Sequence, residues 1–327
     1  MSQAVDTFGR IHKSLRISVT DRCNLRCQYC MPVEGVSCAR REELLTFEEI
    51  VFVVDVATSL GVDRIRITGG EPLLRRNLTT LIRQLKEDTD VVDVAMTTNG
   101  LLLSRHVAAL AEAGLDRVNI SLDSLRPDRF RKITRHGLLK TAWSGVEAAI
   151  EAGFSPLRIN ALLLRGFNDD EVDQWLELTT TMAVDVRFME LMPIGEGAKA
   201  NSLGTYMDLT QLRRRLAEQK GLVPAEVEVG NGPARYWKLP GAPGRVGFIT
   251  PLSDSYCNSC SRMRLTSTGQ LRACLAADRN FDLSAAIRDG DREAVRAGFM
   301  QALKNKPAGH RWRNGQVTRA EMSALGG

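Results

Sequence analysis

Three cysteines lie within eight residues of the chain, at Cys23, Cys27 and Cys30. A zinc knuckle and an ordinary iron–sulfur cluster each take four protein ligands, and no fourth cysteine or histidine lies nearby. The C-x3-C-x2-C spacing therefore favours a four-iron cubane that leaves one iron open to a small molecule. The alternative is that these cysteines are simply buried as small apolar residues.

A second group of three cysteines, Cys257, Cys260 and Cys274, lies near the other end of the chain. The alternative here is a zinc ribbon, but this would need a fourth ligand, and the four histidines lie elsewhere in the sequence: they are His12, His106, His136 and His310. We expect a second iron–sulfur cluster with one open iron. Cys38 lies outside both spacings, and we interpret it as a bystander.

The segment between these cysteines predicts a β-hairpin. Residues 262–266 and 270–272 would pair about the turn at 267–269, which brings Cys274 back toward the first two cysteines. Arg262 and Arg264 alternate along the first of these strands, so both side chains point the same way and can bind one anion together. A solvated basic face is the alternative.

The bulk composition is that of a globular protein. The chain has 327 residues, of which 43% are apolar and 6% aromatic, and a net charge of +5. This charge does not by itself imply a nucleic-acid partner. No stretch resembles a membrane span or a secretory signal, so we expect a cytoplasmic protein that does not bind membranes. In that reducing compartment its seven cysteines are expected to be ligands or free thiols rather than disulfides.

Strands and helices alternate over the first 195 residues. We predict strands at 16–20, 64–68, 91–96, 118–121, 157–164 and 184–191, and helices at 47–60, 78–87, 104–113, 141–152 and 169–182. Such alternation requires parallel strands joined by right-handed crossovers, in an open doubly wound sheet or an incomplete barrel. In either fold the reactive groups gather at the carboxyl ends of the strands.

Motifs whose residues could bind a ligand or take part in a reaction follow these strands. They are the first cysteine loop, GGEP at 69–72, TTNG at 97–100, SLDS at 121–124 and LMP at 191–193. Glycine permits a close backbone approach to a ligand because it has no Cβ.

The alternation stops near residue 195. One helix at 209–220 is followed by short strand-like pieces at 225–229, 236–239 and 246–249, and a helix at 292–304 precedes a Gly326-Gly327 terminus. We therefore expect two units, residues 1–195 and a smaller module, residues 196–327.

The CNLRCQYC motif resembles the signature of the radical S-adenosylmethionine (SAM) enzymes. Nearly the whole chain is similar to the molybdenum cofactor biosynthesis protein A family, the GTP 3′,8-cyclases. The similarity is carried by SVTDRCNLRCQYCMP, RIRITGGEPLLR, TTNG, NISLDSL, FMELMP, YCNSCSRMRLTSTGQLRACL and the final GG.

This resemblance implies an α/β fold, an incomplete (β/α)6 TIM-like barrel with a C-terminal module. It implies two [4Fe-4S] clusters, the first binding SAM and the second binding the substrate. The SAM contacts would be Tyr29, Gly70, Ser121 and Met192. The GTP contacts would be Arg16, Arg66, Thr97, Arg158, Arg262, Met263 and Arg264. The Gly326-Gly327 tail is expected to reach the active site.

The reaction implied is removal of the C3′ hydrogen of GTP by a 5′-deoxyadenosyl radical, followed by addition of the C3′ radical to C8 and then by one-electron reduction and protonation. The product is (8S)-3′,8-cyclo-7,8-dihydroguanosine 5′-triphosphate, made early in molybdopterin biosynthesis. An external one-electron donor and product hand-off to cyclic pyranopterin monophosphate synthase are expected, for a monomer or homodimer. Arg158 stands where the family pattern is expected to have lysine, so a planar fork replaces a point charge.

Two alternative functions would leave different features in the sequence. A radical enzyme that matures a peptide usually carries more than three additional cysteines and lacks the paired arginines after C-x2-C. A non-catalytic zinc or iron–sulfur module that binds nucleic acid predicts four-ligand sites and an aromatic-rich basic face.

Overall fold

The structure is a computed structural model, and it describes residues 3–199, 203–225, 232–320 and 322–325. Six parallel strands follow one another in the sheet in chain order. They are β1 (Ser14–Ser18), β2 (Arg64–Thr68), β3 (Asp93–Thr98), β4 (Arg117–Ser121), β5 (Leu157–Leu162) and β6 (Val184–Met189). The prediction of an incomplete (β/α)6 barrel is confirmed.

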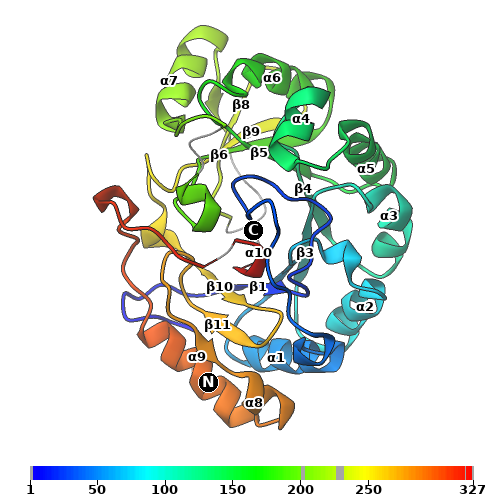
Figure 1. Ribbon diagram of the computed structural model, residues 1–327, viewed down its shortest axis with the longest axis vertical. Coiled ribbons are helices and arrows are strands. Elements are labelled where there is room, and N and C mark those ends of the chain that lie inside the picture. Colours follow the sequence, from blue (N-terminus) through cyan, green and yellow to red (C-terminus); the bar gives the residue numbers. More distant parts are fainter. Residues whose placement is uncertain (1–2, 200–202, 226–231, 321, 326–327) are drawn as a thin grey trace.

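Helices cover the outside of this curved sheet (Figure 1). They are α1 (Phe47–Ser59), α2 (Leu78–Asp88), α3 (Leu103–Glu112), α5 (Leu139–Glu151) and α6 (Val172–Thr181). A capping box begins α1: Thr46 Oγ1 accepts from the amide of Glu49, and the Glu49 carboxylate accepts from the amide of Thr46. A short helix, α4 (Pro127–Thr134), was not predicted.

The C-terminal part of the chain extends the barrel sheet at both edges. Strand β9 (Arg245–Ile249) pairs in parallel with β6, and β10 (Arg262–Leu265) pairs in parallel with β1. The outer strands are β8 (Arg235–Lys238), β7 (Val223–Pro224), β11 (Gln270–Arg272) and β12 (Phe281–Asp282). Over the described residues the sheet has twelve strands, in the order β12-β11-β10-β1-β2-β3-β4-β5-β6-β9-β8-β7.

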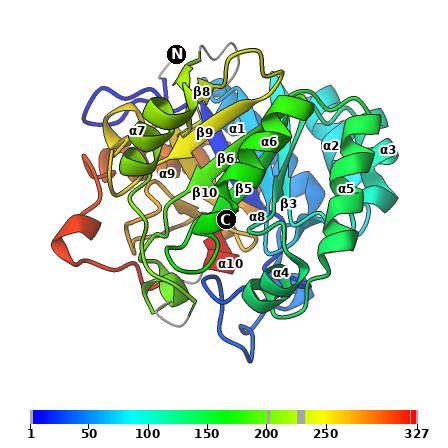
Figure 2. The ribbon, with the colours of Figure 1, turned by 90° about the horizontal axis from the view of Figure 1, so that it is seen from above.

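The remaining helices are α7 (Leu209–Lys220), α8 (Ser284–Arg288), α9 (Arg292–Lys304) and α10 (Met322–Leu325). Figure 2 shows the same elements from above. Most of the strand-like piece predicted at 225–229 lies outside the described residues, and the division of the chain at residue 195 stays a prediction. Among the helices described here, none combines the length and the apolar character that crossing a bilayer requires.

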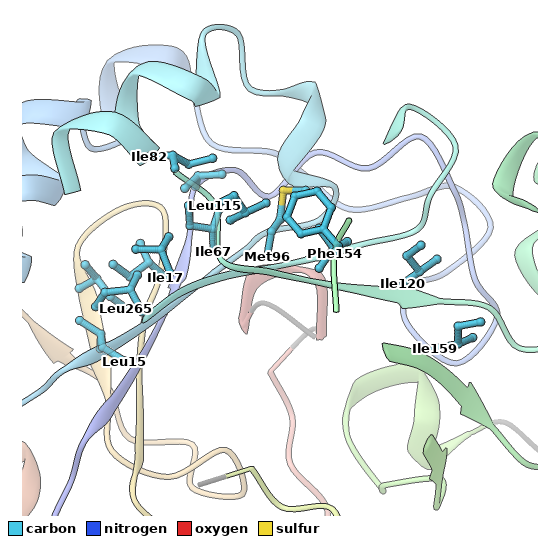
Figure 3. Packing of buried hydrophobic residues seen from close by; sticks show 14 of the residues in the cluster. Leu15, Ile17, Ile67, Ile82, Met96, Leu115, Ile120, Phe154, Ile159 and Leu265 are labelled. Atoms are coloured by element: carbon cyan, nitrogen blue, oxygen red, sulfur yellow. The ribbon is translucent and has the colours of Figure 1, made fainter. Parts of the chain in front are cut away.

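The core lies between the sheet and the outer helices. Leu15 and Ile17 of β1 are fully buried in one cluster with Ile82 of α2 and Leu265 of β10 (Figure 3). The hairpin therefore shares the core of the barrel. Because successive residues of a strand face opposite sides, burying Leu15 and Ile17 outward turns Arg16 inward.

Candidate active site

All six clustered cysteines line one cavity of about 270 Å³ inside the barrel. Three come from the loop after β1, and three come from the segment that surrounds the β10–β11 hairpin. None forms a disulfide. Within the described ranges, no three His, Cys, Asp or Glu side chains are grouped closely enough to hold a single metal ion. Two sets of three free thiols facing a shared cavity fit a larger, iron-based group in each position.

The first cysteine group is held by its own loop. The amides of Cys30 and Met31 donate to the carbonyl of Cys27, at 2.9 and 3.1 Å, and the amide of Leu25 donates to Cys23 Sγ at 3.4 Å. Burial raises the pKa of Cys23, and it raises that of Cys27 well above its usual value. Metal binding must therefore displace protons from these thiols.

The second cysteine group has the opposite electrostatic setting. Burial tends to raise the pKa of Cys260, but the charges of Arg262 and Lys306 outweigh it and lower that pKa to about 6. The Arg262 side chain donates to Cys260 Sγ at 3.7 Å and lies over the Tyr256 ring. A thiolate is thus favoured at this position before any metal binds.

Hydrogen bonds join the GGEP loop to the cysteine loop and to TTNG. The amide of Gly70 donates to the carbonyl of Thr20 at 2.7 Å, and a Cβ at Gly70 would lie 2.3 Å from the carbonyl oxygen of Arg22. The close approach that requires glycine is therefore to the cysteine loop of this chain itself. Buried Glu71 accepts from Thr98 Oγ1 at 2.7 Å and from the amide of Asn99 at 2.8 Å, which joins GGEP to TTNG. Burial raises the pKa of Glu71 to about 7.

The four residues predicted to contact SAM all line the cysteine cavity: Tyr29, Gly70, Ser121 and Met192. The Tyr29 hydroxyl donates to Asp123 Oδ2 at 2.9 Å, and Asp123 Oδ1 accepts from the amide of Leu162 at 2.9 Å. Burial raises the pKa of Asp123 to about 6. The structure brings these residues together beside the first cysteine group.

A second cavity of about 110 Å³ adjoins the first and is rich in arginine. The two cavities share lining residues that include Arg16, Thr97 and Arg262. Seven arginines line the second cavity: Arg16, Arg64, Arg66, Arg117, Arg158, Arg187 and Arg262.

Strand register places four arginines in one row across the sheet. Arg66 of β2 lies beside Arg16 of β1, which lies beside Arg264 of β10 and then Arg272 of β11. Burial, followed by the neighbouring arginines, lowers the pKa of Arg16 to about 10 and those of Arg66 and Arg264 well below their ordinary value. Adjacent like charges destabilise a sheet, so this row favours a bound polyanion.

Asp93 and Asp185, acidic residues beside arginines of the second cavity, already form ion pairs. Asp93 forms an ion pair with Arg117, and Asp185 Oδ2 lies 2.7 Å from Arg245 Nη2 and 3.7 Å from Arg158 Nε. Arg158, the residue that departs from the expected lysine, thus lies between Asp185 and the arginine cavity.

Arg117, Arg187 and Arg272 were not identified from the sequence. Arg187 donates to Asn160 Oδ1 and Asn119 Oδ1, both at 2.8 Å, and Arg272 Nε donates to Asn280 Oδ1 at 2.8 Å. Arg187 and Arg272 lie on predicted strands, and Arg187 alternates with the apolar Val186 and Phe188, which was the available signal. Arg117 lies just before the strand predicted at 118–121, because β4 begins one residue earlier than predicted. Met263 is not brought to either cavity: its side chain is fully buried in the main core on the opposite face of β10.

Helix α10, the last described element, lies inside the barrel. Figure 1 shows α10 inside the ring of strands, and the carbonyl of Leu325 accepts from Arg264 Nη1 at 2.8 Å. Met322 lines the cysteine cavity. The predicted tail residues, Gly326 and Gly327, lie outside the described residues, directly after this contact.

Two family models match the chain. The Radical SAM superfamily matches residues 17–179, and Molybdenum Cofactor Synthesis C matches residues 184–312. The chain is 43% identical to a GTP 3′,8-cyclase of Petrotoga mobilis, over 99% of this chain and all of that protein. It is 46% identical to a GTP 3′,8-cyclase of Pelotomaculum thermopropionicum, over 98% and 99%. Among solved structures, SuiB of Streptococcus suis bound to S-adenosylmethionine shares the fold, with a TM-score of 0.63 and 14% identity over 96% of this chain and 77% of SuiB.

Proposed function

The chain belongs to the GTP 3′,8-cyclase family of the radical SAM superfamily, and we propose that it cyclises GTP to (8S)-3′,8-cyclo-7,8-dihydroguanosine 5′-triphosphate in the two adjoining cavities. The reaction is a step of molybdenum cofactor biosynthesis, and the enzyme uses SAM with iron–sulfur chemistry. The observation that carries the proposal is the joining of a cavity lined by six cysteines to one lined by seven arginines.

We propose two [4Fe-4S] clusters. Cys23, Cys27 and Cys30 would hold the first, next to the SAM contacts at Tyr29, Gly70, Ser121 and Met192. Cys257, Cys260 and Cys274 would hold the second, which leaves one iron for the guanine. When bound, the first cluster and SAM supply the one-electron chemistry that removes a hydrogen atom from the ribose.

The side chains of the protein hold the nucleotide in place. The triphosphate would bind Arg16, Arg66, Arg158 and Arg187, which line the arginine cavity, because charge-assisted hydrogen bonds from guanidinium groups suit phosphate oxygens. Arg264, which lines the cysteine cavity, would contact the nucleotide there. Arg16, Thr97 and Arg262 line both cavities, and so would contact the nucleotide between its phosphates and its reacting ribose. Met263 would contribute only through its backbone.

The barrel would also exclude water and other hydrogen donors from the reacting carbon. Binding and positioning therefore provide the selectivity of a reaction that begins with an unselective radical. Gly326 and Gly327, which follow Leu325 in the sequence, are proposed to complete this enclosure.

We further propose an external one-electron donor, hand-off of the product to cyclic pyranopterin monophosphate synthase, and a monomer or homodimer in the cytoplasm. Reducing conditions there suit six free thiols that must remain available as ligands.

The test is anaerobic incubation of reconstituted protein with GTP, SAM and a reductant, followed by mass analysis. We expect 5′-deoxyadenosine together with a nucleotide that has the mass of GTP and a changed chromatographic retention. Replacing GTP with ATP should give 5′-deoxyadenosine without a cyclised product. Formation of 5′-deoxyadenosine with GTP but no new nucleotide would contradict the proposed function.

A further inference from the structure

A polar turn near the N-terminus lies outside both cavities, yet its three charged or ionisable members are buried. Asp6, Arg10 and His12 are 6%, 8% and 0% exposed. Asp6 Oδ1 accepts from the amides of Phe8 and Arg10, while Asp6 Oδ2 lies 2.6 Å from Arg10 Nε and 2.9 Å from His12 Nε2. The carboxylate thereby fixes the direction of the Arg10 guanidinium.

That guanidinium is directed at the second cysteine group. Arg10 Nη1 donates to the carbonyl of Cys257 at 2.8 Å and to that of Ala308 at 2.7 Å, and Nη2 donates to the carbonyl of Pro307 at 2.7 Å. One side chain thus joins the N-terminal turn, the Cys257 backbone and the loop after α9, although Arg10 and Cys257 are 247 residues apart in sequence.

Lys306 contacts the backbone close to the other two cysteines of the group, Cys260 and Cys274. It is 3% exposed, and its ammonium donates to the carbonyl of Arg262 at 2.8 Å and to that of Ala273. Arg262 follows Cys260 by two residues, and Ala273 directly precedes Cys274. Lys306 also lines the cysteine cavity.

We infer that Asp6, Arg10 and Lys306 form a buried clasp that positions the three thiolates of the second cluster, and that the Lys306 charge raises the reduction potential of that cluster. The inference rests on the proposed function, since it takes Cys257, Cys260 and Cys274 as cluster ligands. Asp6 and Arg10 are positioning residues that act through the ligand-bearing backbone, whereas Lys306 acts through that backbone and also through its charge.

The chemistry of an iron–sulfur centre supports both parts of this inference. Three thiolates and the bridging sulfides give the cluster a negative charge, and nearby positive charge stabilises its reduced form. A buried ammonium exerts this effect strongly because the surrounding dielectric is low.

The positioning part is tested with Arg10→Gln, which cannot reach one carboxylate and three carbonyls together. After anaerobic reconstitution we expect about half of the wild-type iron, since one of two cubanes is lost, with uncoupled SAM cleavage retained. Lys13→Gln is the control, because Lys13 is a partly exposed cation of the same segment, its side chain 42% exposed, and it has no contact with the cysteine segment among the hydrogen bonds and ion pairs of the described residues. Full iron content in Arg10→Gln, or equal loss of iron and SAM cleavage, would overturn the positioning role.

The charge part is tested with Lys306→Gln, which retains two donors and removes the charge. Redox titration followed by electron paramagnetic resonance should show a more negative potential for the second cluster and an unchanged potential for the first. Lys304→Gln, an exposed change on α9, is the control. An unchanged second-cluster potential would overturn the role of the Lys306 charge.

The iron content of the wild-type protein shows whether a failed test refutes this inference or the proposed function. About four irons per wild-type chain would refute the two-cluster proposal itself. About eight irons in both wild type and Arg10→Gln would refute the clasp alone.

Discussion

The neighbouring arginine charges of the arginine row destabilise the folded protein when no anion is bound between them. Arg66 lies beside Arg16, and no ion pair of Arg66 occurs in the described part of the chain. Burial and the neighbouring cations both disfavour its charge. A residue in this position is expected to favour ligand binding at the expense of stability.

Arg66→Met should therefore have two opposite effects. GTP binding should weaken by about 10- to 100-fold, the loss of one or two charge-assisted hydrogen bonds, while the melting temperature of nucleotide-free protein rises. Equilibrium binding and thermal unfolding measure these effects. Arg83→Met, an exposed change on α2, should alter neither. An unchanged dissociation constant for GTP would remove Arg66 from the proposed phosphate site.

His12 gives a pH dependence of stability with a defined direction. Burial and the charge of Lys306 lower its pKa from 6.5 to about 4. Between these values the unfolded chain binds a proton that the folded chain does not, so stability falls as pH is lowered from 6.5 to 4. The loss is at most about 3 kcal/mol.

Thermal unfolding of wild type and His12→Gln between these pH values measures this contribution. The variant should lose less stability than wild type over the interval, and exposed His106→Gln should follow wild type. Burial tends to raise the pKa of Asp6, but its hydrogen bonds outweigh burial and lower that pKa to about 2. The contribution of Asp6 to the free energy of unfolding is therefore lost only below its usual pKa of 3.8. Parallel curves for wild type and His12→Gln would contradict the assignment.

At the scale of elements, the C-terminal segment links substrate binding to the end of the chain. Arg264 of the arginine row donates to the carbonyl of Leu325, the last described residue before Gly326 and Gly327. Deleting Gly326 and Gly327 should lower the cyclisation rate by about 10-fold or more, by loss of positioning, and leave the iron content unchanged. Product formation and iron analysis measure this. Gly326→Ala with Gly327→Ala is the comparison for side-chain bulk, and a fully active truncation would contradict a role for the tail.

Elements with strong local signals were predictable from the sequence. The box at Thr46 and Glu49 fixed the start of α1, and Gly269, at φ +86°, supports the turn of the β10–β11 hairpin. The barrel strands were visible because apolar and inward-facing residues alternate along them. Helix α4 was missed because eight residues make only two turns, which is too short for a periodic pattern.

For the whole molecule, long-range pairing was what the sequence did not reveal. The cysteine groups, GGEP and most of the paired arginines were found, because the types and spacing of these residues imply their chemistry. The pairing of β10 with β1 and the contact of Arg10 with Cys257 join opposite ends of the chain. Nothing local in either segment encodes its partner, whereas Arg187 does carry a local signal, its alternation with Val186 and Phe188.

The two cysteine groups face one cavity, but they should be separable by mutation. Cys274→Ala should lower reconstituted iron from about eight to about four per chain, because the second cluster loses one of three ligands. Uncoupled SAM cleavage should continue, while GTP cyclisation stops. Iron analysis and 5′-deoxyadenosine formation measure this, with Cys38→Ala as the control. Zinc without iron in wild-type protein would contradict both cluster assignments.

Within the described parts of the chain, the outermost strands of the sheet are β7 and β12, each two residues long, and β7 ends with Pro224, which has no amide hydrogen. A sheet margin this short presents few free backbone donors and acceptors to a strand from another molecule. The fold thus ends its large sheet in a way that discourages strand-to-strand aggregation. This protection matters most for newly synthesised chains, which must remain dispersed until iron and sulfide are delivered to them.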